Sequence, residues 1–332
     1  MPQRWALWRR NYPILASSDL HCRIPLFALA PWALACDGVA ASAVAPSPDA
    51  SVGDPLYGSI VVSLRETTES KEAYGLVSGT LYDAPRPNPE PMRVALEEGG
   101  CQLREAIHPF CNDPCGSAAA CVSDDQCLPY PTAQDVGNIT ISGLDLDTGS
   151  TTLEPFAPSF FYQSDELAYP PCQTGASLHL ESTAFTAQAT CIAPLIVDTH
   201  PVRVRTGEPV SLTWDTTESV DPARIQILLD ISHHGGKRGD ILCDVPDSGS
   251  YTIPQNMVTA LVDLGLAGFP SVILTRRSTG TTTPRSGSSV DDVTFIVAAT
   301  VERPVDTGVH SCLRDEDCPD GETCDRQTVT CR

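Results

Sequence analysis

The sequence predicts an all-β protein with two β-sandwich-like domains and a small disulfide-rich module at its C-terminus. Short segments alternate apolar and polar side chains with a period of two, as half-buried strands do. The 29 prolines and 23 glycines separate these segments and disfavour a helical bundle, because proline interrupts helices. Fourteen cysteines are too many for a reducing cytosol, so they indicate an oxidising compartment and disulfide cross-links.

Residues 1–35 have the composition of a secretory signal. Arginines provide nearly all of the charge, and an apolar run over 24–35 ends in small residues. This run of 12 residues is shorter than the roughly 20 that cross a bilayer as a helix. We therefore expect an export signal here and not a transmembrane anchor.

The end of this signal resembles a bacterial lipobox, in which a cysteine is acylated and becomes the mature N-terminus: Ala33-Leu34-Ala35-Cys36. Ala33 and Leu34 are exchanged relative to the usual lipobox order. Lipidation of Cys36 is the preferred interpretation, and simple cleavage after Ala35 is the alternative. Residues 36–56 are small and proline-rich, which predicts the lipid-anchor cysteine and a flexible tether.

The first predicted β domain covers residues 57–197. Its predicted strands are short and rich in β-branched residues, and turn residues separate them. A cysteine-rich loop over 101–131 interrupts this pattern and is expected to project from the domain. The predicted strands are 58–64, 75–82, 92–96, 138–142 and 177–180.

The second predicted β domain covers residues 198–301, and one helix over 254–264 interrupts its strands. Pro254 at the start and Gly265 after the end match the preference of helices for an early proline and a terminating glycine. The polar segment 276–292 predicts a mobile loop. The predicted strands are 202–205, 210–214, 224–231, 240–243, 271–275 and 293–297.

One of these strands carries a resemblance to a known fold. Residues 207–214 resemble an early strand of an immunoglobulin-like or fibronectin-type sandwich, in which a single Trp fills the core. The resemblance implies that Trp214 is buried. It also implies that the second domain is immunoglobulin-like or fibronectin-like.

Twelve cysteines follow Cys36, and an even number favours complete pairing into disulfides. Two clusters lie in short, turn-rich segments that cannot bury a core, so covalent links must hold them. Structural zinc is the alternative, but it usually takes two close cysteine pairs, and only Cys111 and Cys115 have that spacing. Cys172 and Cys191 are expected to pair, because they would close a short loop between neighbouring strands. The clusters are Cys111, Cys115, Cys121 and Cys127, and Cys312, Cys318, Cys324 and Cys331; the dispersed cysteines are Cys101, Cys172, Cys191 and Cys243.

The tail, residues 302–332, resembles the small cysteine-rich modules of secreted proteins, with the pattern C-x5-C-P-x-G-x-x-C. The chain as a whole resembles the cysteine-rich lipoproteins abundant in myxobacteria, which implies a location and an architecture but no activity. In the small modules the first cysteine pairs with the third and the second with the fourth. The pairs so implied are Cys312–Cys324 and Cys318–Cys331, with Cys111–Cys121 and Cys115–Cys127 by analogy.

Three Asp-(Ser/Thr)-Gly triplets begin at Asp147, Asp247 and Asp306. Pepsin-like aspartic proteases carry two such triplets, whose carboxylates share a proton to activate water. Pro246 stands where that family has a hydrophobic residue, so turn formation is the preferred interpretation. The alternative function is a secreted hydrolase that uses Asp147 and Asp247.

Other candidate sites are weaker. His233 and His234 lie between two predicted strands, which indicates a hairpin loop, because adjacent side chains of an extended chain point apart. The acidic segment 315–322 is interrupted by Cys318 and Pro319, which disfavours a calcium loop. Phosphate-loop and dinucleotide motifs are absent from the sequence, and no aromatic platform stands out. We therefore predict no catalytic residue, no metal and no cofactor.

The net charge of the chain limits the kinds of partner that it is expected to bind. The chain has 42 acidic and 21 basic residues, a formal net charge of −21 at pH 7. Nucleic acid is not expected as a partner, because binding it needs a cationic face that releases its counterions. The sequence predicts an exported, lipid-anchored protein of the cell envelope or extracellular space, held to the membrane by its N-terminal lipid. Its expected role is non-enzymatic, either structural or in binding an unidentified protein or carbohydrate ligand.

Overall fold

β-Strands make up most of the structure, a computed structural model that describes residues 55–68, 71–198, 200–216, 223–232, 236–266, 268–308, 312, 314–318, 321–325 and 330–331. The predicted all-β class is confirmed. The predicted signal, Cys36 and the part of the tether before Pro55 lie outside the described residues, as do His233 and His234. Among the described residues, no helix is long and apolar enough to cross a membrane.

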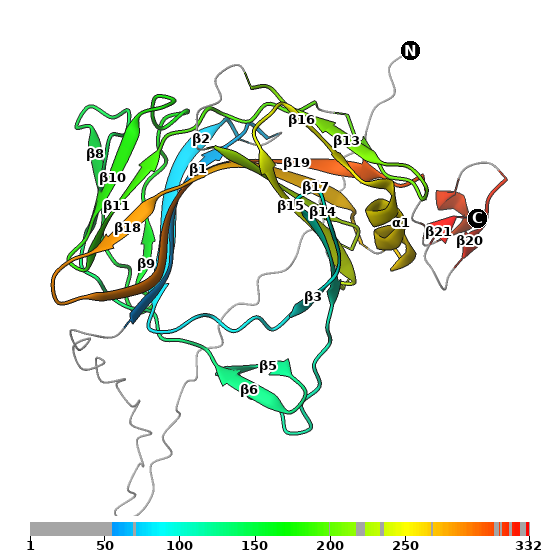
Figure 1. Cartoon of the computed structure of the whole chain (residues 1–332), viewed down its shortest axis with the longest axis horizontal. Coiled ribbons are helices and arrows are strands. Elements are labelled where there is room, and N and C mark those ends of the chain that lie inside the picture. Colours follow the sequence, from blue (N-terminus) through cyan, green and yellow to red (C-terminus); the bar gives the residue numbers. More distant parts are fainter. Residues whose placement is uncertain are drawn as a thin grey trace, which may run out of the picture. The chain divides into compact units, whose positions relative to one another are not determined.

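The largest sheet among the described residues, here called the main sheet, has ten strands, and it includes the first described strand and the long strand that ends at Asp306. β1 (Pro55–Arg65) runs parallel to the long β19 (Ser289–Asp306), and Figure 1 shows the blue β1 beside the orange β19. In spatial order the strands are β3 (Met92–Glu98), β4 (Cys101–Ala106), β15 (Gly239–Pro246), β14 (Arg224–Asp230), β17 (Ser271–Thr279), β19, β1, β2 (Tyr74–Tyr82) and β9 (Phe161–Gln163), with β12 (Val202–Arg203) paired to β19.

Strands from both sides of residue 198 therefore share one sheet. β4 of the first predicted domain pairs with β15 of the second, and β1 pairs with β19. The predicted boundary between residues 197 and 198 does not separate two sheets, and the described residues from Pro55 onward belong to one compact unit. The reason is physical: the alternation that reveals a strand and its buried face does not specify which strand lies beside it.

A five-stranded sheet packs against one face of the main sheet, with β11 contacting β17 and β19. The two sheets enclose large, fully buried side chains such as Ile60, Phe185 and Phe295. One strand of this sheet, β18, lies in the segment 276–292 that was predicted to be a loop. Its threonines have high β-propensity, so the segment continues the sheet. The strands in spatial order are β18 (Thr281–Pro284), β11 (Phe185–Thr190), β10 (Ser177–Glu181), β7 (Ile139–Ser142) and β8 (Ser150–Leu153).

The helix α1 covers Gln255–Asp263 and confirms the helix predicted over 254–264. Pro254 precedes it, and Gly265 follows it with a φ of 94°, which glycine adopts without strain. α1 contacts β15 and β4, and its buried side chains are Met257, Val258 and Leu261.

A separate two-stranded sheet pairs β13 (Val210–Thr213) with β16 (Ser250–Ile253). Trp214 follows β13 directly and is 7% exposed. The core position implied by the sandwich resemblance is therefore confirmed for this side chain.

Six disulfides join the twelve cysteines, and the five pairs predicted from the sequence are all present. The sixth, Cys101–Cys243, was left open by the sequence and links the neighbouring strands β4 and β15. Two cysteines of each cluster lie on a pair of short antiparallel strands, and the other two lie in the segment before it. The first pair is β5 (Ala119–Ser123) with β6 (Gln126–Pro129), and the second is β20 (Cys324–Asp325) with β21 (Thr330–Cys331). The sulfur atoms of the clusters gather closely enough to suggest metal ligands, but each is bonded to another sulfur. The remaining pairs are Cys111–Cys121, Cys115–Cys127, Cys172–Cys191, Cys312–Cys324 and Cys318–Cys331.

Candidate functional site

The structure places the two aspartates of the hydrolase alternative on turns that follow strands of different sheets. Asp147 is exposed on the turn between β7 and β8. Asp247 follows β15, and its side chain is only 3% exposed. Its Oδ2 accepts a hydrogen bond from Nε of Arg276 at 2.8 Å, and its Oδ1 accepts one from Nε1 of Trp214 at 2.7 Å. Asp247 thus holds core side chains together.

Arg276 completes this buried network. Its side chain is 2% exposed, and its guanidinium donates to the carbonyl oxygen of Pro194 at 2.8 Å and to that of Asp215. A buried guanidinium needs such acceptors, because an unpaired buried charge is strongly unfavourable. The network joins β17, the β15–β16 turn and two connecting segments, which is a structural role.

The third triplet also forms a turn. Oδ1 of Asp306 accepts a hydrogen bond from the backbone N–H of Gly308 at 2.8 Å, and Arg205 lies 3.0 Å from Oδ2. The Gly308 N–H, followed by Arg205, lowers the pKa of the Asp306 carboxyl. Turn formation, the preferred interpretation of these triplets, is confirmed at Asp306.

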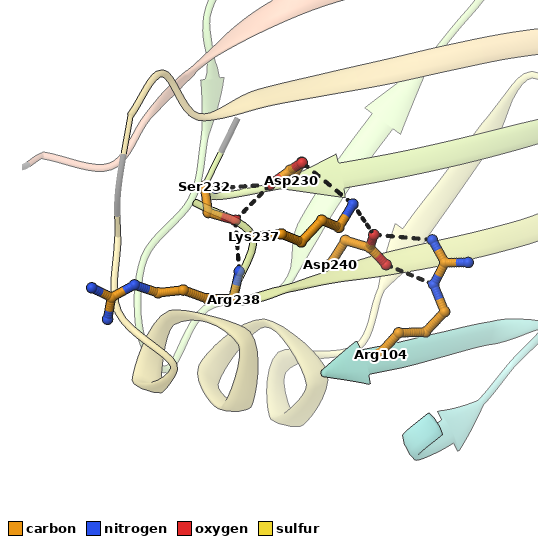
Figure 2. Close-up of polar contacts among 6 residues, drawn as sticks. All are labelled: Arg104, Asp230, Ser232, Lys237, Arg238 and Asp240. Carbon is orange, nitrogen blue, oxygen red and sulfur yellow. Dashed lines mark hydrogen bonds and ion pairs between the residues drawn. The ribbon is translucent and has the colours of Figure 1, made fainter. Parts of the chain in front are cut away.

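A charged cluster lies where β14 and β15 are joined (Figure 2). Asp230 ends β14 and faces Asp240 of β15 across the ladder. The side chain of Asp240 is fully buried, and its carboxylate binds Nζ of Lys237 at 2.7 Å and the Arg104 guanidinium at 2.7 and 3.0 Å. Lys237 also lies 3.6 Å from Asp230, so two cations and two carboxylates balance one another.

The same cluster binds the backbone of Ser232 and Arg238, the residues next to the ends of the two strands. Oδ1 of Asp230 accepts hydrogen bonds from N and Oγ of Ser232 at 2.8 and 3.0 Å. Oγ of Ser232 accepts one from N of Arg238 at 3.2 Å, and the Arg238 guanidinium donates to the carbonyl of Leu264 after α1. Figure 2 shows these side chains between the ends of the strands and α1. A hollow of about 510 Å³ adjoins them, lined by His108, Gly236, Lys237, Arg238 and Leu264.

The main sheet has a second face that is more accessible. In β19 the buried side chains Val293, Phe295 and Val297 alternate with Thr294 and Ile296, which remain partly exposed. β1, β2, β14 and β17 show similar alternation. We call this partly exposed surface the open face; on β19 it comprises Thr294, Ile296, Ala298 and Thr300.

Three aromatic side chains gather at one end of the open face. Tyr57 of β1 pairs across the strands with Tyr82 of β2 on one side and Asp292 of β19 on the other. Phe161 of β9 pairs with Thr80, two residues before Tyr82. They line a hollow of about 470 Å³, here called the aromatic hollow. Its lining also includes Ser59, Ser78, Thr80, Arg86 and Asp292.

Polar contacts orient the walls of the aromatic hollow. The Arg86 guanidinium lies over the Tyr82 ring, 5.3 Å from its centroid. The Tyr57 hydroxyl donates to Oδ2 of Asp291 at 2.5 Å, and this hydrogen bond raises the pKa of Tyr57. The site thus presents aromatic surface, hydroxyls, a cation and a carboxylate in one place.

Sequence reasoning missed the aromatic hollow. Tyr57 and Tyr82 lie 25 positions apart, and Phe161 and Asp292 are far from both. Strand alternation could have placed Tyr57 and Tyr82 on the faces of their own strands, but only the strand pairing brings them together. No aromatic platform stands out in the sequence because the sequence does not show which strands pair.

Comparison with known proteins assigns no family to this chain. The chain was compared with protein-family models, with curated proteins and with solved structures, and nothing matches.

Proposed function

We propose that this protein is an exported, lipid-anchored protein of the cell envelope that binds a ligand on its open face and catalyses no reaction. The observation that carries the binding role is the aromatic hollow in the open face. Concave sites that combine aromatic side chains with a few polar groups are typical ligand sites. The lipid on Cys36 and the tether over 36–56 would hold this surface near a membrane.

The disulfides support export. Six disulfides are consistent with an oxidising extracellular or envelope location, because cytosolic thiols are kept reduced. Two of the pairs cross-link the segment Cys111–Cys127, which holds one short hairpin, and two cross-link the tail after β19. Segments this small bury little apolar surface and depend on such links.

A binding role, not catalysis, also agrees with the charged side chains described above. Asp247 binds Arg276 and Trp214, and Asp240 binds Lys237 and Arg104. These groups hold segments of the fold together. The aromatic hollow, in contrast, presents its side chains to the outside.

The binding role can be tested by capture from envelope extracts with the full chain, purified with its disulfides formed. Ile296 lies on the open face, and Phe269 is 74% exposed in the segment before β17. We expect wild type and Phe269→Arg to retain the same envelope component and Ile296→Arg to lose it. Equal capture by all three proteins would remove the open face from the proposal. Mass spectrometry of the mature N-terminus tests the anchor, and an unmodified Cys36 would refute it.

A further inference from the structure

We propose that the aromatic hollow binds a neutral saccharide. This inference rests on the proposed binding role of the open face and specifies the chemical class of the ligand. It is drawn from the shape, the aromatic surface and the mixed charges of the hollow.

The aromatic side chains provide the first argument. Tyr57 and Tyr82 are direct neighbours on adjacent strands, and Phe161 is 36% exposed on the next strand. A sugar ring presents C–H groups on its faces and hydroxyls around its edge. Exposed aromatic rings can pack against those C–H faces, while the polar atoms nearby bind the hydroxyls. The hollow contains both kinds of surface within about 470 Å³, a volume typical of small-molecule sites.

The charges provide the second argument. The lining contains one donor-only cation, Arg86, and one carboxylate, Asp292. A ligand with a single charge of either sign would pair with one of these groups and leave the other facing a like charge, so the lining favours neither sign. A neutral polyol can use both groups, since each hydroxyl donates one hydrogen bond and accepts others.

The hydroxyl side chains provide the third argument. Ser59 lies next along β1 from Tyr57 on the same face, and Thr80 and Ser78 lie next along β2 from Tyr82. Ser59 pairs with Thr80 across the two strands, so both side chains lie on the same face of the sheet and line the hollow. Short hydroxyl side chains leave room for a ligand and still offer both donors and acceptors.

The test is an array of neutral and acidic oligosaccharides probed with the full chain, purified with its disulfides formed, followed by calorimetry on the strongest binder. We expect a neutral oligosaccharide to bind. Tyr82→Ala and Phe161→Ala should each weaken it about tenfold or more, because each removes stacking surface. Tyr82→Phe should retain most of the affinity, and Phe269→Ala, an exposed aromatic outside the hollow, should be unchanged. Thermal unfolding of each variant confirms that it is folded.

Three results of the saccharide measurements would overturn the inference: an array without binding, preference for acidic saccharides, or binding that survives Tyr82→Ala and Phe161→Ala. A protein captured from envelope extracts through the hollow would also overturn it, since the occupant would then be a polypeptide. A blank array combined with capture that is lost in Ile296→Arg would refute the saccharide and leave the binding role standing. If the array shows no binding and Ile296→Arg captures as much as wild type, both the saccharide and the binding role of the open face are refuted.

Discussion

Arg276 and Asp247 form an ion pair that is almost completely buried, with Nε of Arg276 2.8 Å from Oδ2 of Asp247. The two side chains are 2% and 3% exposed. They connect β17 to the turn after β15, and Trp214 donates to the same carboxylate. Because a buried charge without its partner is costly, this pair should matter more to stability than the exposed ion pairs do.

Asp247→Asn should lower the free energy of unfolding by about 3–5 kcal/mol, because it leaves the Arg276 guanidinium buried without its counter-charge. Asn has nearly the same shape as Asp, so the substitution changes charge more than packing. The measurement is urea unfolding at neutral pH with the disulfides intact.

The matched control is Asp147→Asn, which changes the same residue type at an exposed turn. Its unfolding free energy should stay within about 0.5 kcal/mol of wild type. If the two variants unfolded at the same urea concentration, Asp247 would have no special part in holding the fold.

Gly79→Ala should destabilise the main sheet beneath the aromatic hollow. Gly79 of β2 pairs with Ile60 of β1, and a Cβ at this position would overlap the carbonyl oxygen of Ser59. The backbone must shift to admit it, so we expect a loss of about 1–3 kcal/mol in the free energy of unfolding. Ser78→Ala, at the adjacent position, should be much milder. Thermal unfolding of both variants measures the difference, and equal stabilities would show that the strands can separate without cost.

Local pattern was sufficient to predict the class of fold and many of its elements. The segment 177–180 alternates strictly and forms β10, and the proline and glycine around 254–264 mark the ends of α1. The resemblance of the tail to small cysteine-rich modules implied the four pairs within the clusters, and a short loop favoured Cys172–Cys191. These features depend on residues that are near one another in the chain.

Long-range pairing could not be predicted in the same way. β1 and β19 are more than 220 positions apart, and their parallel pairing merges the two predicted domains into one sheet. The alternation in each strand identifies its buried face but is compatible with many partners. The aromatic hollow depends on this pairing, which is why its residues carried no signal in the sequence.

Removing the Cys101–Cys243 disulfide should lower stability by about 2–5 kcal/mol. Both cysteines are fully buried, and they link β4 to β15 across a sequence separation of 142. The double variant Cys101→Ala/Cys243→Ala loses this constraint on the unfolded chain. Cys312→Ala/Cys324→Ala removes a link with a separation of 12 in the tail and should leave the main transition close to wild type. Thermal unfolding under oxidising conditions compares them, and equal losses would argue that the tail and the main sheet unfold together.

Tyr162 should make the fold sensitive to alkaline pH. Its side chain is fully buried, and its hydroxyl accepts from N of Val136 at 3.0 Å and donates to the carbonyl of Gly137 at 3.1 Å. Burial raises its pKa to about 12, whereas an unfolded tyrosine titrates near 10. The native state therefore holds this proton more tightly, and the resulting stabilisation is complete below about pH 10 and is lost as the pH rises towards about 12.

Urea unfolding at increasing pH should show a steeper decline in the free energy of unfolding for wild type than for Tyr162→Phe. The exposed Tyr130→Phe should decline like wild type. Parallel declines for wild type and Tyr162→Phe would mean that the Tyr162 hydroxyl ionises as readily in the folded as in the unfolded chain.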